Sequence, residues 1–410
     1  RDDVPPVFLP AHQTYKEVHA EFVALCKSEG WRAIAESTFR SIWHQCLPHI
    51  RFMTPRMDVC AVCEDLRRKV VSAAAEADKL TACRNLEEHI TEAQKERELY
   101  KQRAVDAKTE YDDYVAAGSV EVSPLTKQKY TFDFAQNVSL PHTARQIGPI
   151  YFKTPRKVQL FGVCCESIPK QINYLIDEAD TIGQDGKKSH NPNTVVSLLH
   201  HYFANHALEE KECYLYADNC AGQNKNRTVV SYLAWRCIVG LHKKITLSFM
   251  ITGHTRCLVD GMFGLLKRKY RRSDCHSLQQ LATVVSESAV SNIPQLLPGS
   301  TVTWYEWDTY FAKLFKPIPS ISKSHHFVFT AEMPGMVETK RFVDSDAVAV
   351  PILKVTAEEV KAAGIPATLP AGGLSQARQE YLHKEIRPFI AVEHQDTLCP
   401  APAASSQLSP

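Results

Sequence analysis

The chain has 410 residues, room for two or three domains, and its 44% hydrophobic and 23% charged residues are typical of a globular protein. Its formal net charge of +2 is too small to indicate a nucleic acid or a membrane as partner, so local charge has to be examined instead. The sequence shows neither a signal peptide nor an apolar run long enough to cross a membrane.

The 13 cysteines are an odd number. Without a secretion signal, they are expected to be thiols or metal ligands in a reducing compartment, the cytosol or the nucleus. The chain begins with Arg1 rather than Met, so we expect it to be a fragment that lacks an upstream segment.

The first 63 residues are predicted to form a helical region. Apolar residues recur at helical spacing between residues 12 and 29, and Gly30 is expected to end this helix. A second short helix is expected to start near Ser37, a good N-cap, and to end before Pro48. Two such helices are typical of a helix-turn-helix, whose second helix contacts DNA, and also of an ordinary helical pair that packs on a neighbour.

Residues 64–118 are predicted to form a long helix, a helical hairpin or a coiled coil. The stretch 64–116 contains neither proline nor glycine, and an apolar stripe runs along it in steps of three and four. Several stripe positions are alanine and one is Arg97, so the seam is weak. Formation of a homo-oligomer through this helix and packing on the rest of the same chain are both open.

Strand and helix patterns alternate from residue 128 to 316. Strands are predicted at 129–134, 158–165, 171–176, 213–217 and 245–251, with a further strand-like run at 149–152. Helices are predicted at 193–206, 226–239 and 258–270. Three strands followed by helix, strand, helix, strand and helix is the order of an RNase H-like domain. The predicted fold class is therefore α/β, a mixed sheet with helices on both faces, preceded by an all-α N-terminal region with a long helical arm.

The pattern weakens after residue 316, and residues 317–393 are predicted to form a small α+β region. A hairpin is expected between 326–329 and 341–343, around Pro334-Gly335, and helices are expected at 357–363 and 375–385. From about His394 the chain is rich in Pro, Ala and Ser, and it is expected to be disordered.

Three aspartates fall where a metal site of this fold would need them. Asp133 lies in the centre of the first strand, Asp218 ends the fourth strand, and Asp260 lies near the start of the last helix. In this fold the fourth strand lies beside the first. Two Mg²⁺ or Mn²⁺ ions about 4 Å apart need hard oxygen ligands from separate elements, and clustered carboxylates would repel one another without them. We therefore predict that these aspartates are catalytic metal ligands.

The aspartates also have structural interpretations. Asp218 precedes Asn, which is typical of a turn, and Asp260 suits the N-terminus of a helix through the helix dipole. Asp133 is harder to explain, because an unpaired carboxylate in an apolar strand is costly. Rival or auxiliary ligands are Asp177, Glu178, Asp180, Asp274 and Glu287. Auxiliary polar groups, which contact the ligands or substrate or are merely hydrogen-bonded, are Asn219, Gln223 and His254.

Two motifs resemble a large family of animal proteins thought to derive from DNA transposons. They are DNCAGQNKNR at 218–227 and GHTRCLVDGMFGLLK at 253–267, and FMTPRMDVCAVC at 52–63 resembles the N-terminal region of the same family. The core, 128–272, resembles that of a DDE/D-type transposase. The resemblance implies metal-dependent cleavage and joining of DNA strands with Asp133, Asp218 and Asp260 as ligands. The usual transposase pattern ends in Glu, where this chain has Asp260.

Cys60 and Cys63 form a Cys-x-x-Cys, a spacing that suits half of a tetrahedral zinc site. A second pair of the same spacing is missing. The residues considered as completions are His44, Cys46, His49, Cys83 and His89, of which His89 is the preferred zinc ligand. Two ordinary thiols and a redox pair are the alternatives.

The run Lys267-Arg-Lys-Tyr-Arg-Arg272 has five positive charges in six residues. It is typical of a phosphate-binding surface, a nuclear localisation signal or a solvated helix end. The residues predicted to contact nucleic acid are Lys225, Arg227, Lys267, Arg268, Lys269, Arg271 and Arg272. Lys225 and Arg227 precede a helix whose free N–H groups suit a phosphate.

These features together predict a nuclear, DNA-binding, transposase-like enzyme with two Mg²⁺ or Mn²⁺ ions, a structural Zn²⁺ and no membrane partner. The alternatives are a domesticated protein that binds DNA or acts as a scaffold without catalysis, and a nuclease of the same fold that does not transpose.

Overall fold

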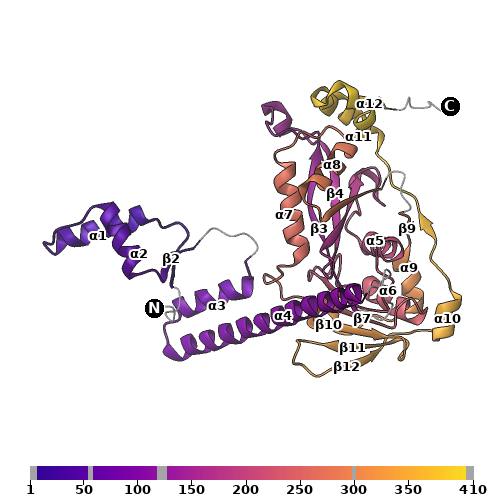
Figure 1. Cartoon of the computed structure of the whole chain (residues 1–410), viewed down its shortest axis with the longest axis horizontal. Helices are drawn as coiled ribbons and strands as arrows, with labels where there is room; N and C mark the ends of the chain where they lie inside the picture. The colour runs from indigo at the N-terminus through magenta and orange to yellow at the C-terminus, as the bar shows by residue number, and fades with distance from the viewer. Residues whose placement is uncertain (1–6, 54–58, 118–126, 298–301, 403–410) are drawn as a thin grey trace. The chain divides into compact units, whose positions relative to one another are not determined.

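The computed structural model describes residues 7–53, 59–117, 127–297 and 302–402. The chain divides into two compact units, Arg1–Glu64 and Asp65–Pro410 (Figure 1). In the described part of the chain, no helix combines the length and the apolar composition that a membrane crossing requires.

The first unit contains the two helices expected from the sequence. Helix α1, Tyr15–Ser28, starts with a capping box between Thr14 and Glu17, and Gly30 follows its end with a φ of 70°. Helix α2, Glu36–Cys46, begins one residue before Ser37, with Ala35 at the N-cap and no side-chain cap. The two-stranded parallel pair of this unit consists of β1, Val7–Leu9, and β2, Ile50–Phe52. The expected start at Ser37 is therefore displaced, because Ala35 caps α2 through its extended backbone alone.

Residues 64–117 form a helical hairpin. Helix α3 spans Ala61–Ser72 and α4 spans Glu76–Ala116, 41 residues without a break. Helix α4 packs on the large sheet of its own unit: Tyr100 Oη donates to Glu166, and Arg103 donates to Tyr216 Oη at 3.0 Å and to Ser248 Oγ at 2.9 Å. Of the two arrangements left open by the sequence, packing on the same chain is the one present along this stretch. Self-association through the rest of α4 stays a prediction.

The second unit is built on a nine-stranded mixed sheet with the strand order β12-β11-β10-β7-β6-β3-β4-β5-β8 (Figure 1). Its central strands are β3 (Lys127–Leu140), β4 (Arg156–Cys165), β5 (Lys170–Asp177), β6 (Glu212–Ala217) and β7 (Lys244–Phe249). Strand β4 is antiparallel to both β3 and β5, whereas β6 and β7 run parallel to β3. The fourth strand of the core, β6, thus lies beside the first, β3, as expected.

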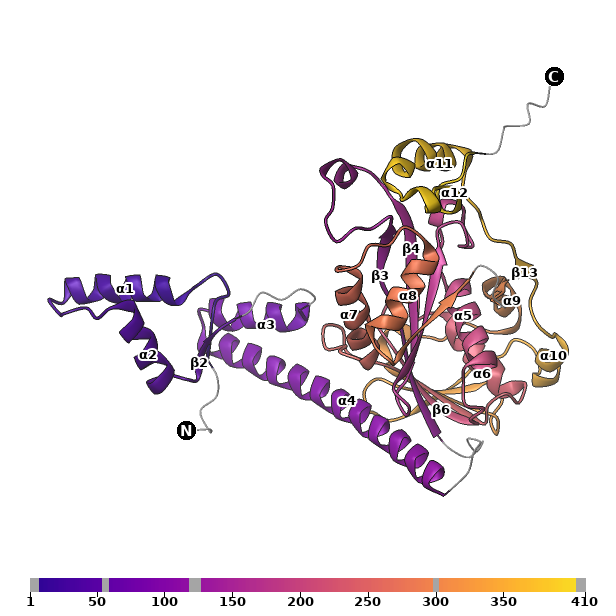
Figure 2. The same ribbon diagram turned by 45° about the horizontal axis from the view of Figure 1, so that its top comes forward.

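Helices cover both faces of this sheet (Figure 2). On one face α5 (Pro192–Asn205), α6 (Arg227–Ile238) and α9 (Trp307–Leu314) bury an apolar core with Tyr130 and Phe132 of β3. On the other face α7 (Leu258–Tyr270) and α8 (Leu278–Ser288) pack against odd-numbered residues of β3, such as Ala135. Side chains of β3 thus contribute to two separate cores, one on each face of the sheet.

The remaining elements complete the second unit. They are η1 (Gly148–Phe152), η2 (Gln184–Gly186), β8 (Asn292–Leu296), β9 (Trp304–Tyr305), η3 (Ile321–Lys323), β10 (His326–Thr330), β11 (Met336–Lys340), β12 (Val348–Pro351), α10 (Ala357–Ala362), β13 (Thr368–Leu369), α11 (Gln376–Tyr381), η4 (Leu382–Ile386), η5 (Arg387–Phe389), η6 (Val392–His394) and α12 (Gln395–Leu398).

Two expectations for the second unit are wrong. Residues 149–152 belong to the 3₁₀ turn η1, since Pro149 takes the first turn of a helix readily and has no N–H to give a strand. The hairpin partner of β10 is β11, closer to the Pro334-Gly335 turn than 341–343, because Gly335 has a φ of 80° and makes a short connection possible. Within the predicted region 317–393, β10 pairs with β7 and extends the main sheet.

The expectation of disorder from His394 is also wrong as far as residue 402. Leu398 and Cys399 are buried in the core beneath α7 and α8, and their carbonyl oxygens accept hydrogen bonds from Arg156 and Arg387 respectively. Burying these apolar side chains offsets the entropy lost on ordering the segment. The rest of the expected disordered tail, 403–410, lies outside the described residues.

Gly162 on β4 fixes how closely α7 approaches the sheet. A Cβ atom at this position would lie 2.6 Å from Cζ of Phe263, which is buried on α7. We expect Gly162→Ala to destabilise the protein by about 1–3 kcal/mol through overpacking. The measurement is urea denaturation.

Gly264 on the same helix is the matched control. A Cβ atom there meets nothing within 4 Å. Gly264→Ala should stabilise the protein by about 0.5–1 kcal/mol, because alanine is the better helix former. Equal effects of the two substitutions would contradict the close approach at Gly162.

Candidate functional site

Asp133 and Asp218 lie at the same level on neighbouring parallel strands. The register of β3 and β6 pairs Lys127 with Glu212 and continues to Thr131 and Tyr216. Asp133 is two residues beyond Thr131, and Asp218 is two residues beyond Tyr216, directly after the end of β6. Because side chains alternate along a strand, Asp133 points to the same face as Thr131. That is the face covered by α4 and α7.

Asp260 joins this site from α7. It is the third residue of the helix, and its carboxylate accepts a hydrogen bond from the N–H of Cys257 at 2.9 Å, which caps the helix start. Phe263, almost one turn later, packs over Gly162, and Gly162 is the residue paired with Asp133 in the β3–β4 register. The capping interaction suggested by the sequence is real, and it places Asp260 above the strand that carries Asp133.

The charges of the three aspartates act on one another. Burial raises the pKa of Asp133 to about 7, and the negative charges of Asp218 and Asp260 add to this shift. Asp260 is more exposed. Its partial burial raises its pKa, opposed by the Cys257 N–H and reinforced by the charge of Asp218. Bound cations would relieve this repulsion between the negative charges of the three carboxylates.

Lys267 is a cation that faces this site. Burial lowers the pKa of its ammonium group, as does the charge of Arg271, whereas Asp133 and Asp260 raise it. One partly buried lysine does not neutralise three carboxylates. The site therefore has an excess of negative charge that suits divalent cations.

Asp218 is held by Asn224, a residue that the sequence analysis missed. The Asn224 side chain is fully buried and donates to Asp218 Oδ1, and the N–H of Cys220 donates to the same oxygen at 3.3 Å. Both donors lie in the loop between β6 and α6. The only signal for Asn224 in the sequence is its place in the motif at 218–227.

The three aspartates offer carboxylate oxygens, the donors that Mg²⁺ and Mn²⁺ prefer. Elsewhere in the described chain, the ligand atoms of Glu210, Cys213 and His242 all lie within 4.8 Å of one another. The carboxylate oxygens of the three aspartates are spread more widely than that. A site for two ions is wider than a site for one, because ions about 4 Å apart each take their own ligands. The donor set fits two hard divalent cations.

Other predicted site residues have structural partners. Glu178 forms an ion pair with Arg378 at 2.9 Å and Asp177 pairs with Arg156 at 2.6 Å, so both carboxylates are neutralised away from the trio. Asp274 accepts from the N–H of Ala144 at 2.7 Å, and Glu287 pairs with Lys269 at 2.8 Å. Burial raises the pKa of Asp180 to about 6, with the Asp177 charge as a second cause.

The predicted auxiliary residues Asn219, Gln223 and His254 have contacts with residues other than the three aspartates. The Asn219 amide lies 3.4 Å from the His325 ring, and the N–H of Gln223 donates to the carbonyl of Cys220 at 3.3 Å. His254 lies in the loop after β7, where its ring contacts that of His89 with centroids 5.3 Å apart.

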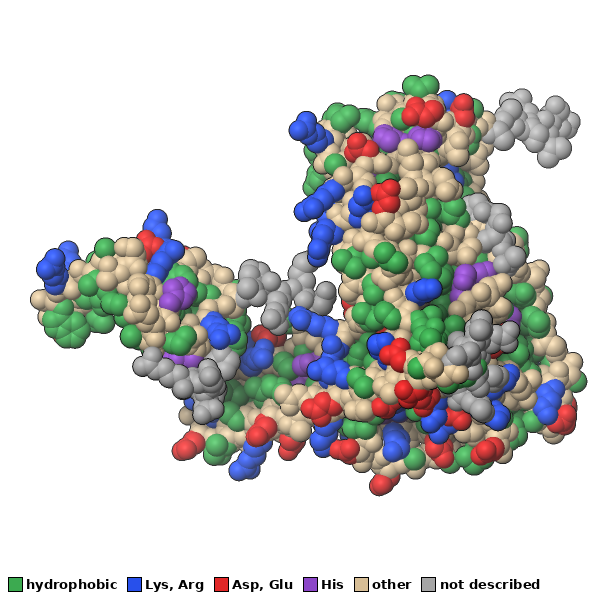
Figure 3. Space-filling view, viewed as in Figure 1, with side chains coloured by type: hydrophobic (Ala, Val, Ile, Leu, Met, Phe, Trp, Pro, Cys, Tyr) green, Lys and Arg blue, Asp and Glu red, His purple; other side chains and the backbone are tan. Residues whose placement is uncertain are grey.

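The predicted nucleic-acid contacts divide into two groups. Lys225 is buried, and its ammonium group donates to the carbonyl of Ser322 at 3.1 Å, while burial lowers its pKa to about 8. Arg227 pairs with Asp308 at 3.0 Å. In contrast, Arg268, Arg271 and Arg272 are exposed. Figure 3 shows Lys and Arg side chains projecting from the edge of the second unit where α7 lies. These exposed arginines are available to phosphates, whereas Lys225 and Arg227 are engaged by partners within the chain.

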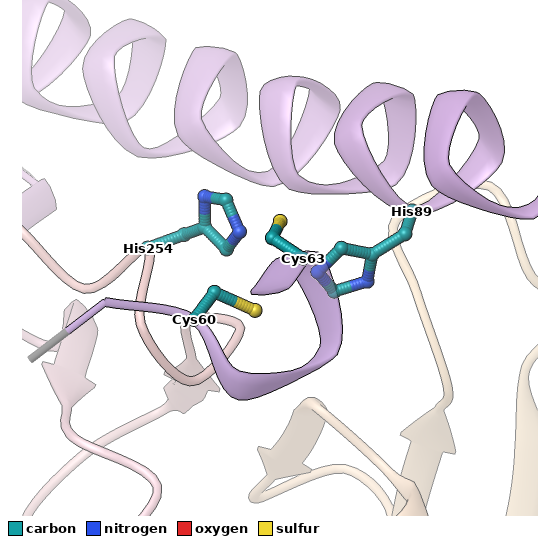
Figure 4. A group of neighbouring side chains, drawn as sticks. All are labelled: Cys60, Cys63, His89 and His254. Carbon is teal, nitrogen blue, oxygen red and sulfur yellow. The ribbon is translucent and has the colours of Figure 1, made fainter. Parts of the chain in front are cut away.

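Two pairs of soft or borderline metal ligands are present, one in each unit. Cys60 and Cys63 lie at the start of α3, both buried, with their sulfur atoms within 4.8 Å of each other. His89 on α4 and His254 offer ring nitrogens within 4.8 Å of each other. Figure 4 draws these four side chains and the segments that carry them. Among the residues considered as completions of the cysteine pair, Cys46 and Cys83 are exposed thiols.

Glu210, Cys213 and His242 form a further compact group in the second unit. His242 Nε2 lies 3.6 Å from Glu210 Oε1, and its Nδ1 accepts from Arg236 at 3.2 Å. The guanidinium of Arg236 supplies the positive charge that this buried group needs. We therefore interpret the group as a polar cluster of the core, not as a metal site.

Comparison with known proteins gives a match over part of the chain. A family model described as a domain of unknown function, DUF7869, matches residues 179–345, which include Asp218 and Asp260 and begin after Asp133. No curated protein matches the chain, and neither does any solved structure.

Proposed function

We propose that the protein is a transposase-like enzyme that cuts and joins DNA strands with the help of two Mg²⁺ or Mn²⁺ ions held by Asp133, Asp218 and Asp260. The observation that carries the proposal is the convergence of these aspartates, from two neighbouring strands and a helix start, at one face of a mixed sheet. The resemblance of the two motifs at 218–227 and 253–267 to transposon-derived proteins gives the reaction class.

In this reaction, the role of the protein's own side chains is to position the metal ligands and the substrate. Two bound divalent cations would activate a water or a 3′-hydroxyl and stabilise the leaving oxygen of a phosphodiester. Asn224 and the N–H of Cys220 orient the Asp218 carboxylate, and the N–H of Cys257 orients that of Asp260. Lys267 supplies a positive charge at the rim of the site, where a phosphate would come closest.

The exposed arginines at the end of α7 fit a role in DNA binding. Arg268, Arg271 and Arg272 follow the helix that carries Asp260, so phosphates that they contact would lie near the metal ligands. Such contacts make affinity depend on salt concentration and not on sequence. A nuclear location follows from the proposed substrate.

The thiols of Cys60 and Cys63 are proposed to contribute to a structural zinc site, as their Cys-x-x-Cys spacing suggests. Thiolate and imidazole are the donors that zinc prefers, whereas the carboxylates of the trio suit Mg²⁺ or Mn²⁺. Zn²⁺ would therefore bind at the thiols, and Mg²⁺ or Mn²⁺ at the three aspartates, because of the different ligand chemistry.

Titration with Mn²⁺ separates the enzyme from a non-catalytic scaffold that keeps the same fold. We expect calorimetry to show Mn²⁺ binding by the wild-type chain and at least about tenfold weaker binding by Asp133→Asn, which removes one anionic ligand. Asp346→Asn is the control, because Asp346 is exposed and distant in sequence from the trio. Mn²⁺ binding that is absent, or equal in wild type and Asp133→Asn, would support the scaffold.

A further inference from the structure

Three large apolar side chains are exposed on the β3–β4 connection, residues 141–155 of the second unit. They are Ile147, Tyr151 and Phe152, with exposed fractions of 59%, 73% and 86%. Tyr151 and Phe152 are neighbours in η1 and pack edge to face, with ring centroids 5.2 Å apart. A single exposed apolar residue is normal in a folded protein, whereas a cluster of them indicates a surface that contacts a partner.

Both ends of the β3–β4 connection are attached to other parts of the second unit. Near its start, His142 and Cys275 exchange two backbone hydrogen bonds of 2.8 and 2.7 Å. The His142 ring also stacks on that of Tyr270, with centroids 4.0 Å apart. Near its end, Lys153 forms an ion pair with Glu385. Figure 2 shows the connection extending beyond the ends of β3 and β4. The exposed rings are thus held in place before a ligand arrives, which lowers the entropy lost on binding.

A cavity of about 350 Å³ lies between the β3–β4 connection and the end of α7. Its lining includes Ile147, Ile150 and Tyr151 from the connection, Tyr270 from α7, and Phe389. The volume is at the lower end of the range for ligand pockets, about 300–1,000 Å³. Aromatic walls suit a flat ring such as a nucleobase, which stacks on them.

Four exposed arginines give this surface a positive charge. Arg145 lies on the β3–β4 connection, and Arg268, Arg271 and Arg272 lie at the end of α7. The N–H of the residue before Arg145 donates to Asp274 at 2.7 Å, so the connection runs beside the segment that follows α7. None of the four arginines forms an ion pair with another described residue. Proteins bind single-stranded nucleic acid with this combination, in which cations contact the phosphates and aromatic rings stack on the bases.

We propose that Tyr151 and Phe152 stack on unpaired bases of the DNA whose phosphates the arginines contact. The inference rests on the proposed function, since it takes the DNA at the metal site as the ligand. Bases in a duplex are covered by their neighbours, so only unpaired or unstacked bases offer their faces to these rings. Asp260 and Tyr270 lie about 15 Å apart along α7, at about 1.5 Å per residue. The unpaired bases would therefore lie on the order of five nucleotides from the cleaved phosphate, at about 3.4 Å per step.

DNA binding by the full chain without divalent metal tests the proposal apart from cleavage. Fluorescence anisotropy compares a labelled single strand with the same sequence as a blunt duplex. We expect Tyr151→Ala with Phe152→Ala to weaken single-strand binding by about tenfold or more, as the loss of a stacked base does, and duplex binding by less than about twofold. Tyr151→Phe with Phe152→Tyr keeps both rings and should bind like the wild type. Both side chains are exposed, so urea denaturation of the alanine variant should match the wild type.

Val290→Ala is the matched control, because it shortens a fully exposed apolar side chain on another connection and should leave both affinities unchanged. Unchanged single-strand affinity in the alanine variant would overturn the proposal, as would an equal loss for single strand and duplex. A changed oligomeric state with unchanged DNA affinity would also overturn it and assign the surface to contact between copies of the chain. Because these assays contain no divalent metal, they can fail while nicking by the wild type succeeds, and the reverse.

Discussion

Asp218→Asn is expected to lose Mn²⁺-dependent DNA nicking by about a thousandfold or more while its affinity for DNA stays within about twofold. The substitution keeps the shape of the side chain and an oxygen that accepts the hydrogen bond from Asn224. It removes the negative charge that Asp218 would offer to the proposed metal ions. The exposed arginines at the end of α7 are untouched, which is why binding should persist.

Nicking of supercoiled plasmid with Mn²⁺ measures the loss, and fluorescence anisotropy of labelled DNA measures the affinity. Asp346→Asn serves again as the control and should nick like the wild type. Retention of nicking by Asp218→Asn would refute the catalytic role of this carboxylate. Loss of nicking together with loss of DNA affinity would indicate a binding defect instead.

Lys129→Met should destabilise the second unit by about 3–5 kcal/mol. Lys129 is fully buried in β3, with its ammonium group 2.5 Å from Glu166 and 3.4 Å from the centre of the Tyr100 ring. Among the described residues, removal of the lysine charge leaves the buried Glu166 carboxylate with the hydroxyl groups of Tyr100 and Thr131 as its side-chain hydrogen-bond donors. Such an uncompensated buried charge is costly.

Urea denaturation measures this change, and a double variant identifies its cause. Lys129→Met with Glu166→Gln removes both charges and keeps a polar partner for Tyr100, so it should recover most of the lost stability. Lys108→Met is the surface control, because the Lys108–Asp112 pair on α4 is exposed and should contribute less than about 1 kcal/mol. A double variant as unstable as Lys129→Met would show that packing, and not charge, causes the effect.

The sequence predicted most elements of the sheet and its helices because their signals are local. Helix α7 has the predicted bounds, 258–270, and α6 begins one residue after its predicted start because Asn226 caps it, with its side chain accepting from the N–H of Val229. Apolar spacing and capping residues act over one or two turns, so they can be read without the rest of the fold. The positions of the three aspartates within a strand, at the end of a strand and near the start of a helix were likewise predicted from local patterns.

Partners distant in the sequence could not be predicted in this way. Glu178 was a candidate ligand, but it pairs with Arg378, 200 residues later, and Lys225 was a candidate phosphate contact, but it is buried against Ser322. Residues 394–402 have the composition of a disordered tail and are ordered all the same, because the core beneath α7 and α8 accepts Leu398 and Cys399.

The sequence by itself determined where most strands and helices form. It also determined which residues at or near the ends of these elements have carboxylate, thiol and imidazole side chains. The tertiary structure alone decided that Asp133 and Asp218 are level on adjacent strands, that Gly162 lets α7 bring Asp260 above them, and that His254 lies beside His89. The physical reason is that strand pairing and helix packing join segments tens to hundreds of residues apart. The free energy of those contacts depends on shape and burial, which no local pattern in the chain encodes.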